Sequence, residues 1–450
     1  MGALALASTA AACFLAGCAS HPYSMSRARA LMAQQDYTRA LGEVDRVCQS
    51  EEDPLCLLEK GLLLHYAGSY RESNQTFERA EVLTDRLYTK SASREAASLV
   101  TSDLALRYVP RPFEQVLVNY FRALNYMFLA DEEGALVECR KASQKLARYS
   151  AEDGRPYRQD AFLEYLTGVL YEWGGQTNDA YVSYKNALTA YHTYGELFGV
   201  TAPPELRCDL VRTARALGFQ DQIDSLTALA AQACTDAAAI PTKDLAKVVV
   251  LVERGFVPAK QELALETPIL KSEADRARGD PAGFSLGVSS RATGFIYDAD
   301  DVAYFLRIAL PHYPEAPPAC APSLYVDSLR HTPSLCEDVY AIARAELEGD
   351  LPGVFAKALA RAIIKYKVTD KAGDKYGWMV RWLANLVTST TEQADLRGWL
   401  SLPRSVYITT LYLEPGRHAL SVQAADGGAP REVVLEARAG ATSFVRFREY

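Results

Sequence analysis

The sequence has no run of eighteen consecutive apolar residues, so no segment of it is predicted to cross a membrane as a helix. It also lacks an excess of positive charge. Its 48 Lys and Arg residues against 56 Asp and Glu residues give a net charge of −8, which argues against a general nucleic-acid-binding protein. Charged residues make up 23% and hydrophobic residues 49% of the chain, a globular balance that excludes wholesale disorder. Its 450 residues suffice for two or three domains.

The usual patterns of metal and catalytic sites are scarce. The six histidines form no H-x-x-x-H pair and no two cysteines have the C-x-x-C spacing, so we predict no metal site and no cofactor. One run, Gly283–Gly287, fits the G-x-S-x-G motif around Ser285. A nucleophile elbow needs a buried strand before the serine and a helix after it, whereas both flanks here are polar. We predict a protein that is not an enzyme, with a serine hydrolase using Ser285 as the weaker alternative.

The first seventeen residues form an uncharged, mostly apolar stretch of signal-peptide length. It ends in Leu15–Cys18 (Leu-Ala-Gly-Cys), which resembles the lipobox of bacterial lipoproteins, although no basic residue precedes the apolar run. Ala19 and Ser20 follow, without the aspartate that retains lipoproteins at the inner membrane. The resemblance implies a signal peptide over residues 1–17, lipid on Cys18 and an outer-membrane protein that faces the periplasm or the cell surface. An ordinary secretory signal with a chance cysteine is the alternative.

The cysteine content suits an oxidising compartment. Seven cysteines follow Cys18, and they form three near-neighbour pairs and one single residue. The predicted disulfides are Cys48–Cys56, Cys208–Cys234 and Cys320–Cys336. Cys139 lies where the helical pattern expects a large core residue, so we predict a buried free thiol there.

From residue 24 to about 235 the sequence predicts a series of helices, four stretches of which share one spacing. A small residue opens each stretch, a large residue follows three positions later, and another small residue comes twelve positions after the first; the opening residues are Ala28, Gly61, Ala123 and Gly168. This spacing resembles the tetratricopeptide repeat, in which two antiparallel helices meet at small residues. The resemblance implies an α-solenoid over residues 18–235. An irregular helical bundle is the alternative.

In tetratricopeptide proteins the first helix of each pair lines a concave groove that binds partners. Six residues on those helices lie outside the packing pattern and are the predicted partner-binding residues: Glu59, His65, Asn119, Tyr120, Glu164 and Tyr165. Tyr120 and Tyr165 precede the small residue of their repeats by the same three positions, which suggests a repeated site. Tyrosine is common among interface hot spots, so these two are the preferred anchors.

After residue 235 the pattern becomes rich in β-structure. The valine run in Lys247–Glu253 predicts a buried strand, and alternation predicts three or four short strands within 405–447. We predict a second domain over residues 236–450, β-sandwich-like with a helical insertion at about 337–398. The fold class is thus multidomain, α followed by α+β. The last fifty residues resemble small sandwich modules of the carboxypeptidase-regulatory or PEGA kind, which bind partners or act as spacers.

A basic stripe follows within the helical insertion. It consists of Lys357, Arg361, Lys365, Lys367, Lys371 and Lys375. The first three are spaced by four, so they share one helix face. A solvated face is the default interpretation, and contact with anionic lipid headgroups or glycan is the functional one.

The run Thr391–Pro403, together with Val248–Gln261, resembles an uncharacterised family of proteobacterial lipoproteins with tetratricopeptide-like N-terminal halves. Its members are often encoded near small lipoproteins that resemble activators of penicillin-binding proteins. The resemblance implies a role in the envelope and supplies no catalytic residues. We therefore predict a lipid-anchored periplasmic scaffold or adaptor that binds envelope proteins or peptides, other lipoproteins included, in cell-wall or envelope-machine assembly. A structural subunit of a large outer-membrane-associated complex is the alternative.

Overall fold

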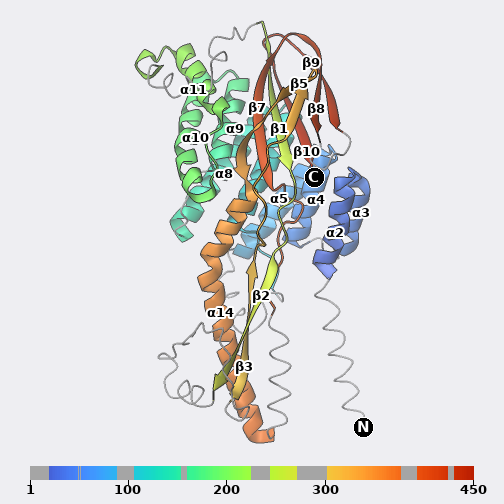
Figure 1. Cartoon of the computed structure of the whole chain (residues 1–450), viewed down its shortest axis with the longest axis vertical. Helices are drawn as coiled ribbons and strands as arrows, with labels where there is room; N and C mark the ends of the chain where they lie inside the picture. The colour runs from blue at the N-terminus through green and yellow to red at the C-terminus, as the bar shows by residue number, and fades with distance from the viewer. Residues whose placement is uncertain are drawn as a thin grey trace.

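The computed structural model describes residues 20–48, 50, 52–88, 106–153, 160–223, 244–270, 302–376, 393–423 and 430–450. It consists of a helical array, built from the N-terminal half, and a β-rich module with a long helix, built from the C-terminal half (Figure 1). The predicted signal peptide, Cys18, Cys234 and Ser285 lie outside the described residues. No helix in the described ranges has the length and hydropathy needed to cross a bilayer.

The helical array is made of antiparallel helix pairs (Figure 1). The pairs are α2 (Ser20–Ala33) with α3 (Tyr37–Val47), α4 (Pro54–Tyr66) with α5 (Tyr70–Tyr88), α7 (Pro112–Phe128) with α8 (Glu132–Asp153), and α9 (Ala161–Trp173) with α10 (Thr177–Phe198), and α11 (Pro204–Leu217) follows them. The small residues lie where the helices of a pair meet. A Cβ atom added to Gly61 would stand 2.7 Å from the Phe77 ring, so only glycine allows this close approach. The four predicted helix pairs are confirmed.

The turns inside the four pairs repeat one another in detail. The residue seven positions after each opening small residue has a positive φ: 61° at Gln35, 81° at Gly68, 58° at Ala130 and 74° at Gly175. The N–H of the next residue then bonds back to the carbonyl five positions earlier, as in Ser69 to Leu64 and Gln176 to Tyr171. A left-handed residue at this place ends a helix and satisfies its last carbonyl groups. The four pairs are therefore copies of one structural unit.

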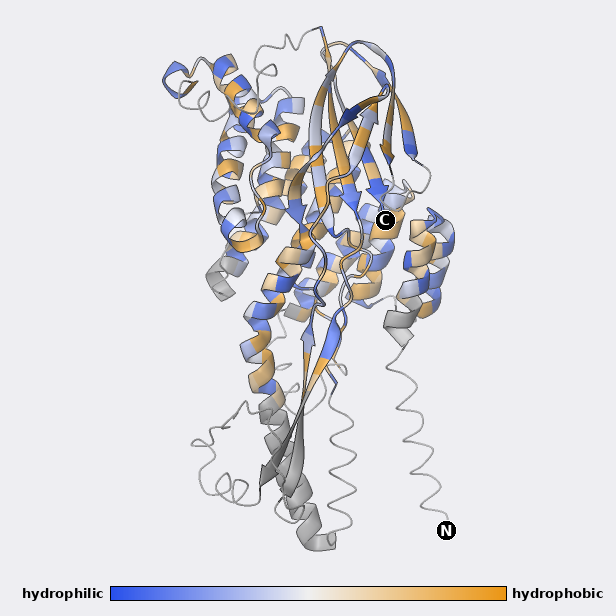
Figure 2. Cartoon of the chain, viewed as in Figure 1, coloured by the Kyte–Doolittle hydropathy of each residue, from blue (hydrophilic) through white to orange (hydrophobic). Residues whose placement is uncertain are grey.

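The C-terminal half forms two four-stranded sheets and one hairpin. The first sheet has the order β10 (Thr442–Glu449), β1 (Ala246–Arg254), β7 (Ser405–Leu413), β6 (Ser334–Asp338), and the second has the order β5 (Leu329–His331), β4 (Ser323–Val326), β8 (Gly416–Gln423), β9 (Arg431–Ala437). In Figure 2 their strands are banded in orange and blue, as expected when apolar and polar side chains alternate.

Strand β1 is buried on both faces, which explains its unbroken valine run. It pairs in parallel with β10 and antiparallel with β7. Val248, Val250 and Val252 join a core shared with the second sheet, whereas Val249 and Leu251 belong to the core shared with the helices. The C-terminal half is therefore a mixed-sheet module, and its first sheet lies between the second sheet and the helical array.

A long arm projects from the body formed by the array and the two sheets. It consists of the hairpin formed by β2 (Gln261–Leu270) and β3 (Val302–His312) and of the helix α14 (Val339–Tyr376), which contacts β3 and runs beside the hairpin away from the array (Figure 1). At 1.5 Å per residue, a helix of 38 residues is about 57 Å long. The helical insertion expected at about 337–398 does not reach its predicted end, because residues 393–398 are not helical, and α14 continues through Pro352.

Candidate functional site

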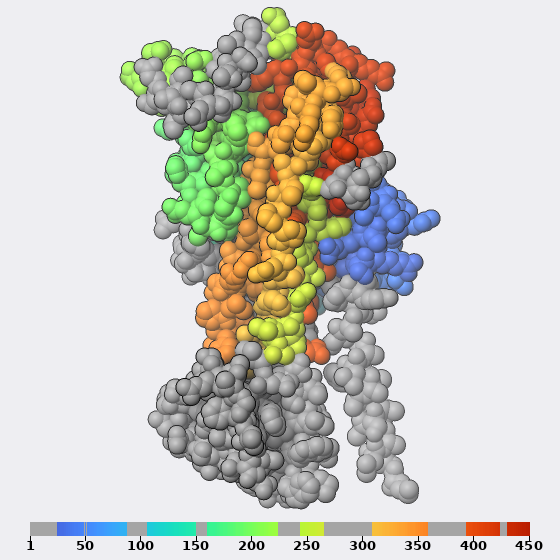
Figure 3. Space-filling model, in the orientation of Figure 1, coloured from blue at the N-terminus to red at the C-terminus, as the bar shows by residue number. Residues whose placement is uncertain are grey.

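The six residues predicted to line an open groove are all buried, with at most 8% of any of them exposed. The prediction that they meet an external partner is wrong for the chain in this structure. The first helices of the repeats face the C-terminal module, and in Figure 3 that module lies between the blue first repeat and the green last helices. The groove is thus occupied by the protein's own chain.

The centre of this contact is a segment without regular secondary structure, residues 397–402, which turns at residues 400 and 401 and is held by the carboxyl groups of Glu59 and Glu114. Glu114 on α7 accepts the backbone N–H of Trp399 at 2.8 Å. Glu59 on α4 accepts the N–H groups of Leu400 at 2.7 Å and Ser401 at 3.2 Å. Hydrogen bonds to an ionised acceptor are about twice as strong as neutral ones. Because they address the backbone, they hold the conformation of the segment as well as its position.

Trp399 anchors the segment in the array. Its ring packs edge-on against Phe77 and Phe121, with centroids 5.7 and 5.8 Å away, and its indole N–H donates to Ser401 Oγ at 3.0 Å. A buried tryptophan with its N–H satisfied buries a large apolar area without an unpaired donor. Thr391–Pro403, the run that carries the family resemblance, therefore contains the segment that fills the groove.

A second set of contacts fixes the start of the segment. The Lys260 ammonium donates to the Arg397 carbonyl at 2.6 Å, and the Arg397 guanidinium donates to the Leu106 carbonyl at 2.8 Å and pairs with Asp395. Burial lowers the pKa of Lys260 to about 8, and the neighbouring Arg111 acts in the same direction. The segment is thus bound to both the array and the strip of chain after β1.

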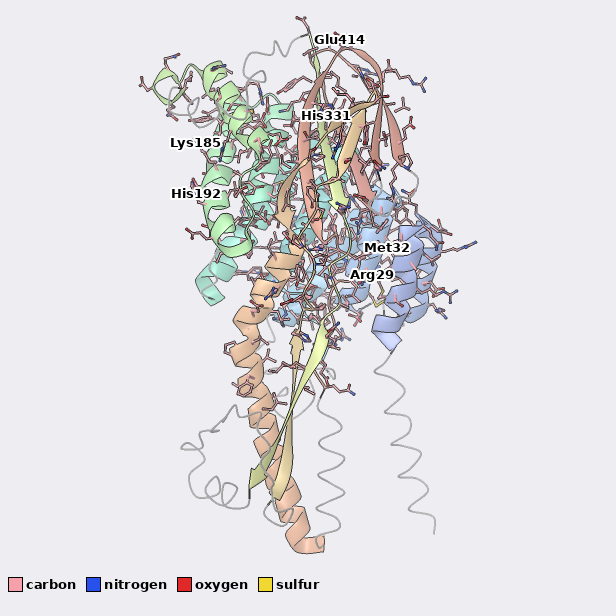
Figure 4. All side chains as sticks on the ribbon, viewed as in Figure 1. Arg29, Met32, Lys185, His192, His331 and Glu414 are labelled. Atoms are coloured by element: carbon pink, nitrogen blue, oxygen red, sulfur yellow. A yellow bond between two sulfur atoms is a disulfide. The ribbon has the colours of Figure 1, made fainter. Side chains whose placement is uncertain are left out.

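The pKa of the Glu59 carboxyl is unusually high. Its complete burial raises its pKa to about 7, against the hydrogen bonds from Ser401 and Leu400 and the positive charge of Arg29, which lower it. Arg29 lies on the side of α2 that faces the body, with its guanidinium 4.4 Å from the centre of the Phe256 ring (Figure 4). The grip on residues 400 and 401 is therefore sensitive to pH near neutrality.

The two equivalent tyrosines have different partners. Tyr120 donates to Glu253 of β1 at 3.0 Å, whereas Tyr165 donates to Asp209 of α11 at 2.9 Å. Asn119 donates to Glu138 at 2.7 Å. These side chains join helices and strands inside the body, which corrects their assignment as external anchors.

Glu164 and His65 also serve the interior. Glu164 accepts from Ser143 at 3.1 Å, and His65 Nδ1 lies 2.6 Å from Asn125 Oδ1. Asn125 in turn donates to Ser73 and Asn74, so the network joins the second and third repeats. Burial, and then the charge of Arg446, keep the pKa of His65 well below its ordinary value, so it is a neutral packing residue.

An ion cluster attaches the far end of the array to the sheet. Lys247 of β1 and Arg212 of α11 each donate to Glu172 at 2.7 Å, and Arg212 also pairs with Asp209. Burial opposes the ionisation of Glu172, but Lys247 and Arg212 together lower its pKa to about 2. The ion pairs of this cluster join the two halves of the chain.

Two of the cysteine predictions are confirmed. Cys48 and Cys56 form a disulfide with Cα atoms 5.8 Å apart, and Cys139 is a buried free thiol. Cys208 is disulfide-bonded, while its expected partner Cys234 lies outside the described residues.

The predicted bridge Cys320–Cys336 is wrong, because both residues are free thiols. Cys336 is buried in β6, where its thiol donates to the Val406 carbonyl at 3.2 Å. Cys320 is exposed in the proline-rich loop before β4, whose backbone is held by Tyr407 donating to the Cys320 carbonyl at 2.8 Å. The two side chains therefore lie in opposite environments.

Of the basic stripe, only Lys357 has a described side chain, and it is partly exposed on α14. Within the described ranges, no three His, Cys, Asp or Glu side chains are placed to hold a metal ion. The contacts around the groove are those of an interface between two parts of one chain.

No protein-family model and no curated protein matches this chain. It is similar to the solved structure of MamA (TM-score 0.31, 11% identity, 49% of this chain and 94% of that one). It is also similar to BtubC from P. vanneervenii (0.31, 16%, 46% and 74%) and to PilW, a type IV pilus biogenesis factor (0.24, 15%, 49% and 94%). At these TM-scores the similarities say nothing about partners. The array is tetratricopeptide-like on its own geometry, through the repeated small residues and the repeated left-handed turn residue.

Proposed function

We propose that this protein is a lipid-anchored scaffold of the bacterial envelope whose helical array clamps its own C-terminal module and whose arm meets a protein partner. The observation that carries the proposal is the filled groove. Three successive backbone N–H groups of residues 399–401 occupy Glu59 and Glu114, the acceptors that an incoming peptide would need. Partner binding in this fold therefore belongs to a surface outside the groove.

The arm is the surface that best fits this role. A two-stranded hairpin is marginally stable in water unless something covers it, and among the described elements α14 runs along it. Leu263, at the root of the hairpin, has 48% of its surface exposed. A partner that packs on the hairpin would bury apolar side chains and supply the missing cover.

Two observations support the envelope and the lipid anchor. The Cys48–Cys56 disulfide is typical of an oxidising compartment. Helix α2 begins at Ser20, two residues after Cys18. Lipid on Cys18 would therefore hold the first repeat at the membrane surface without a flexible tether.

Shortening the hairpin tests the role of the arm. Ala264 and Ala309 are directly opposite in the β2–β3 ladder, so replacing residues 265–308 by Asn-Gly closes the hairpin with a two-residue turn. A photocrosslinker at position 263 of the full chain should capture an envelope protein in cells, and the shortened chain should lose that product while remaining folded. A crosslinker at Val182, an exposed valine on α10, is the matched control. Equal capture by both chains would contradict the proposal.

Replacing Cys18 by Ala tests the anchor. We expect the wild-type chain in the membrane fraction, with an N-terminal peptide heavier than its sequence by acyl groups. The variant should be recovered in the soluble fraction. An unmodified wild-type N-terminus would refute the anchor without touching the role of the arm.

A further inference from the structure

A small cavity lies where the array meets the sheet, and two carboxyl groups line it. Its volume is about 10 Å³, and the two acids are Asp160, directly before α9, and Glu337, in β6. The remaining lining side chains are all apolar: Phe113, Val116 and Leu117 of α7, Leu146 of α8, and Val339 and Ile342 of α14. No basic side chain is among the described residues that line the cavity, which has room for about one water molecule.

The two carboxyl groups are satisfied to different degrees. Asp160 caps α9, with its Oδ1 accepting the Leu163 N–H at 2.8 Å. Glu337 is 2% exposed, and its Oε2 has no hydrogen-bond partner in the described part of the chain. An unpartnered, buried carboxyl oxygen is costly unless it carries a proton or meets a donor.

Among the described residues, the charged groups that act on the two carboxyls are acidic. The titratable side chains near the pair are Glu164 of α9, Tyr191 and Tyr194 of α10, Glu205 of α11, and Cys336 and Asp338 of β6. All of them are acids. Two carboxylates that share an apolar cavity cannot both be ionised at moderate cost, so one of them must hold a proton.

The surroundings of the two carboxyl groups determine which of them holds the proton. Burial raises the pKa of Asp160 to about 6, but the Leu163 N–H and the Tyr194 hydroxyl oppose the rise. Burial raises the pKa of Glu337 much further, and the charges of Asp160 and Asp338 act in the same direction. Asp160 is therefore the carboxylate and Glu337 the acid.

We propose that the junction between the array and the sheet is a proton-binding site, in which protonated Glu337 donates to Asp160 across the cavity, directly or through one water. The ligand is a single proton, held only when the two halves of the chain are assembled. No bond other than this hydrogen bond forms. The proposal is independent of the arm, of the lipid anchor and of any partner.

The sign of the resulting pH dependence follows from linkage. A glutamate in the unfolded chain titrates near 4.5, and Glu337 titrates higher when folded. Its contribution to stability is complete below about pH 4.5 and is lost as the pH rises toward the folded-state pKa. One proton changes the unfolding equilibrium constant by up to about tenfold per pH unit in this window.

The test compares Glu337→Gln with Glu348→Gln in the full chain. Glu348 is an exposed residue of α14, so its variant makes the same Glu-to-Gln replacement without touching the cavity. Between about pH 5 and pH 8, the proton on Glu337 should raise the unfolding constant of the wild type by up to about tenfold per pH unit. The unfolding constant of Glu337→Gln should lack this contribution. Infrared spectra at neutral pH should show protonated carboxyl bands in the wild type and in Glu348→Gln, and the contribution of Glu337 should be missing in Glu337→Gln, while that of Glu59 remains.

An unchanged pH slope together with an unchanged infrared band in Glu337→Gln would overturn the proposal. If that variant does not fold, Asp160→Asn supplies the test, because asparagine caps a helix as well as aspartate does. The Glu337 band should then shift, since its acceptor is no longer charged. A band at the wild-type position would place the proton elsewhere.

Discussion

A few side chains join parts of the chain that are hundreds of residues apart. Glu59 and Glu114 bond to residues 341 and 285 positions later, and Tyr120 bonds to Glu253. Such contacts are the reason that the two halves form one body. Their loss should affect the whole molecule, whereas the loss of a contact inside one repeat should not.

Trp399→Ala should lower the free energy of unfolding by about 3–5 kcal/mol, because it empties the space between Phe77 and Phe121. Urea unfolding followed by circular dichroism measures the change. Trp399→Phe, which keeps most of the apolar volume, is the control and should cost clearly less. A change below about 1 kcal/mol for the alanine variant would mean that the segment is not anchored by this ring.

Glu172 and Glu59 should respond to pH with opposite signs. Glu172 has a folded-state pKa of about 2 against an ordinary value of 4.5, so its stabilisation is complete above about pH 4.5 and is lost as the pH falls toward 2. Glu172→Gln should cost about 3 kcal/mol at neutral pH and much less near pH 3. The pKa of about 7 at Glu59 instead weakens the fold as the pH rises from about 4.5 to 7. Denaturation midpoints measured from about pH 2 to pH 7 check both signs. A loss of stability in Glu172→Gln that does not depend on pH would contradict the ion cluster.

The sequence identified side chains that pack within a repeat, but it did not identify those that are buried by a distant part of the chain. The spacing identified Cys139 as a core residue, and it is one. The same spacing set Tyr120 and Tyr165 outside the packing pattern of a repeat, yet both are buried, and Tyr165 also packs against Tyr184 of its own helix pair. Their partners Glu253 and Asp209 lie 133 and 44 residues away, beyond any local pattern.

At the scale of the elements, the positions of the turns in the repeats could be predicted from the sequence, but the backbone strain in these turns could not. The turn in the third pair has Ala130 at a φ of 58°, where its counterparts Gly68 and Gly175 have no Cβ. An L-residue in the left-handed region costs about 1–2 kcal/mol. This turn, like the Gln35 turn of the first pair, is thus less stable than the two glycine turns, which the residue types alone do not reveal.

Ala130→Gly should therefore stabilise the protein by about 0.5–1 kcal/mol, the relief of strain minus the added freedom of the unfolded chain. Gly175→Ala should destabilise it by a similar amount, since nothing surrounds that position and the strain alone acts. Thermal melting of both variants checks the pair. Shifts of the same sign would show that the two turns are not equivalent.

The long helix and the sheet order mark the limit of local reasoning. Gly349 and Pro352 predict a helix break, yet α14 continues past both, since packing against β3 outweighs one lost hydrogen bond. The strand Lys247–Glu253 was predicted, but its parallel pairing with Thr442–Glu449 was not. A hydrophobic pattern predicts that a strand exists, but it does not identify the strand with which it pairs.

For the whole molecule, the filled groove makes the two halves interdependent. Without the array, the module would expose Trp399 and the helix-facing side of β1 with Val249 and Leu251. We expect residues 244–450 to aggregate when expressed alone and to be soluble when co-expressed with residues 20–223. Co-purification of the two fragments measures the association.

The control for this experiment is the N-terminal fragment with Glu59→Lys and Glu114→Lys, which replaces both acceptors by donors. It should no longer bind the module. If the two fragments are instead soluble separately and do not associate, the array is not a clamp.

The distance in sequence between Glu59 and Leu400 has a consequence for the newborn chain. A ribosome makes the helices first, and 341 further residues must follow before the groove receives its own segment. At about 5–20 residues per second this takes about 17–70 s. In the part of that time that follows the synthesis of Phe121, the surface formed by Phe77 and Phe121 is open to any extended peptide nearby. A chaperone that binds unfolded chains would therefore find its best site on the unfinished protein, and would lose it when the last strand is made.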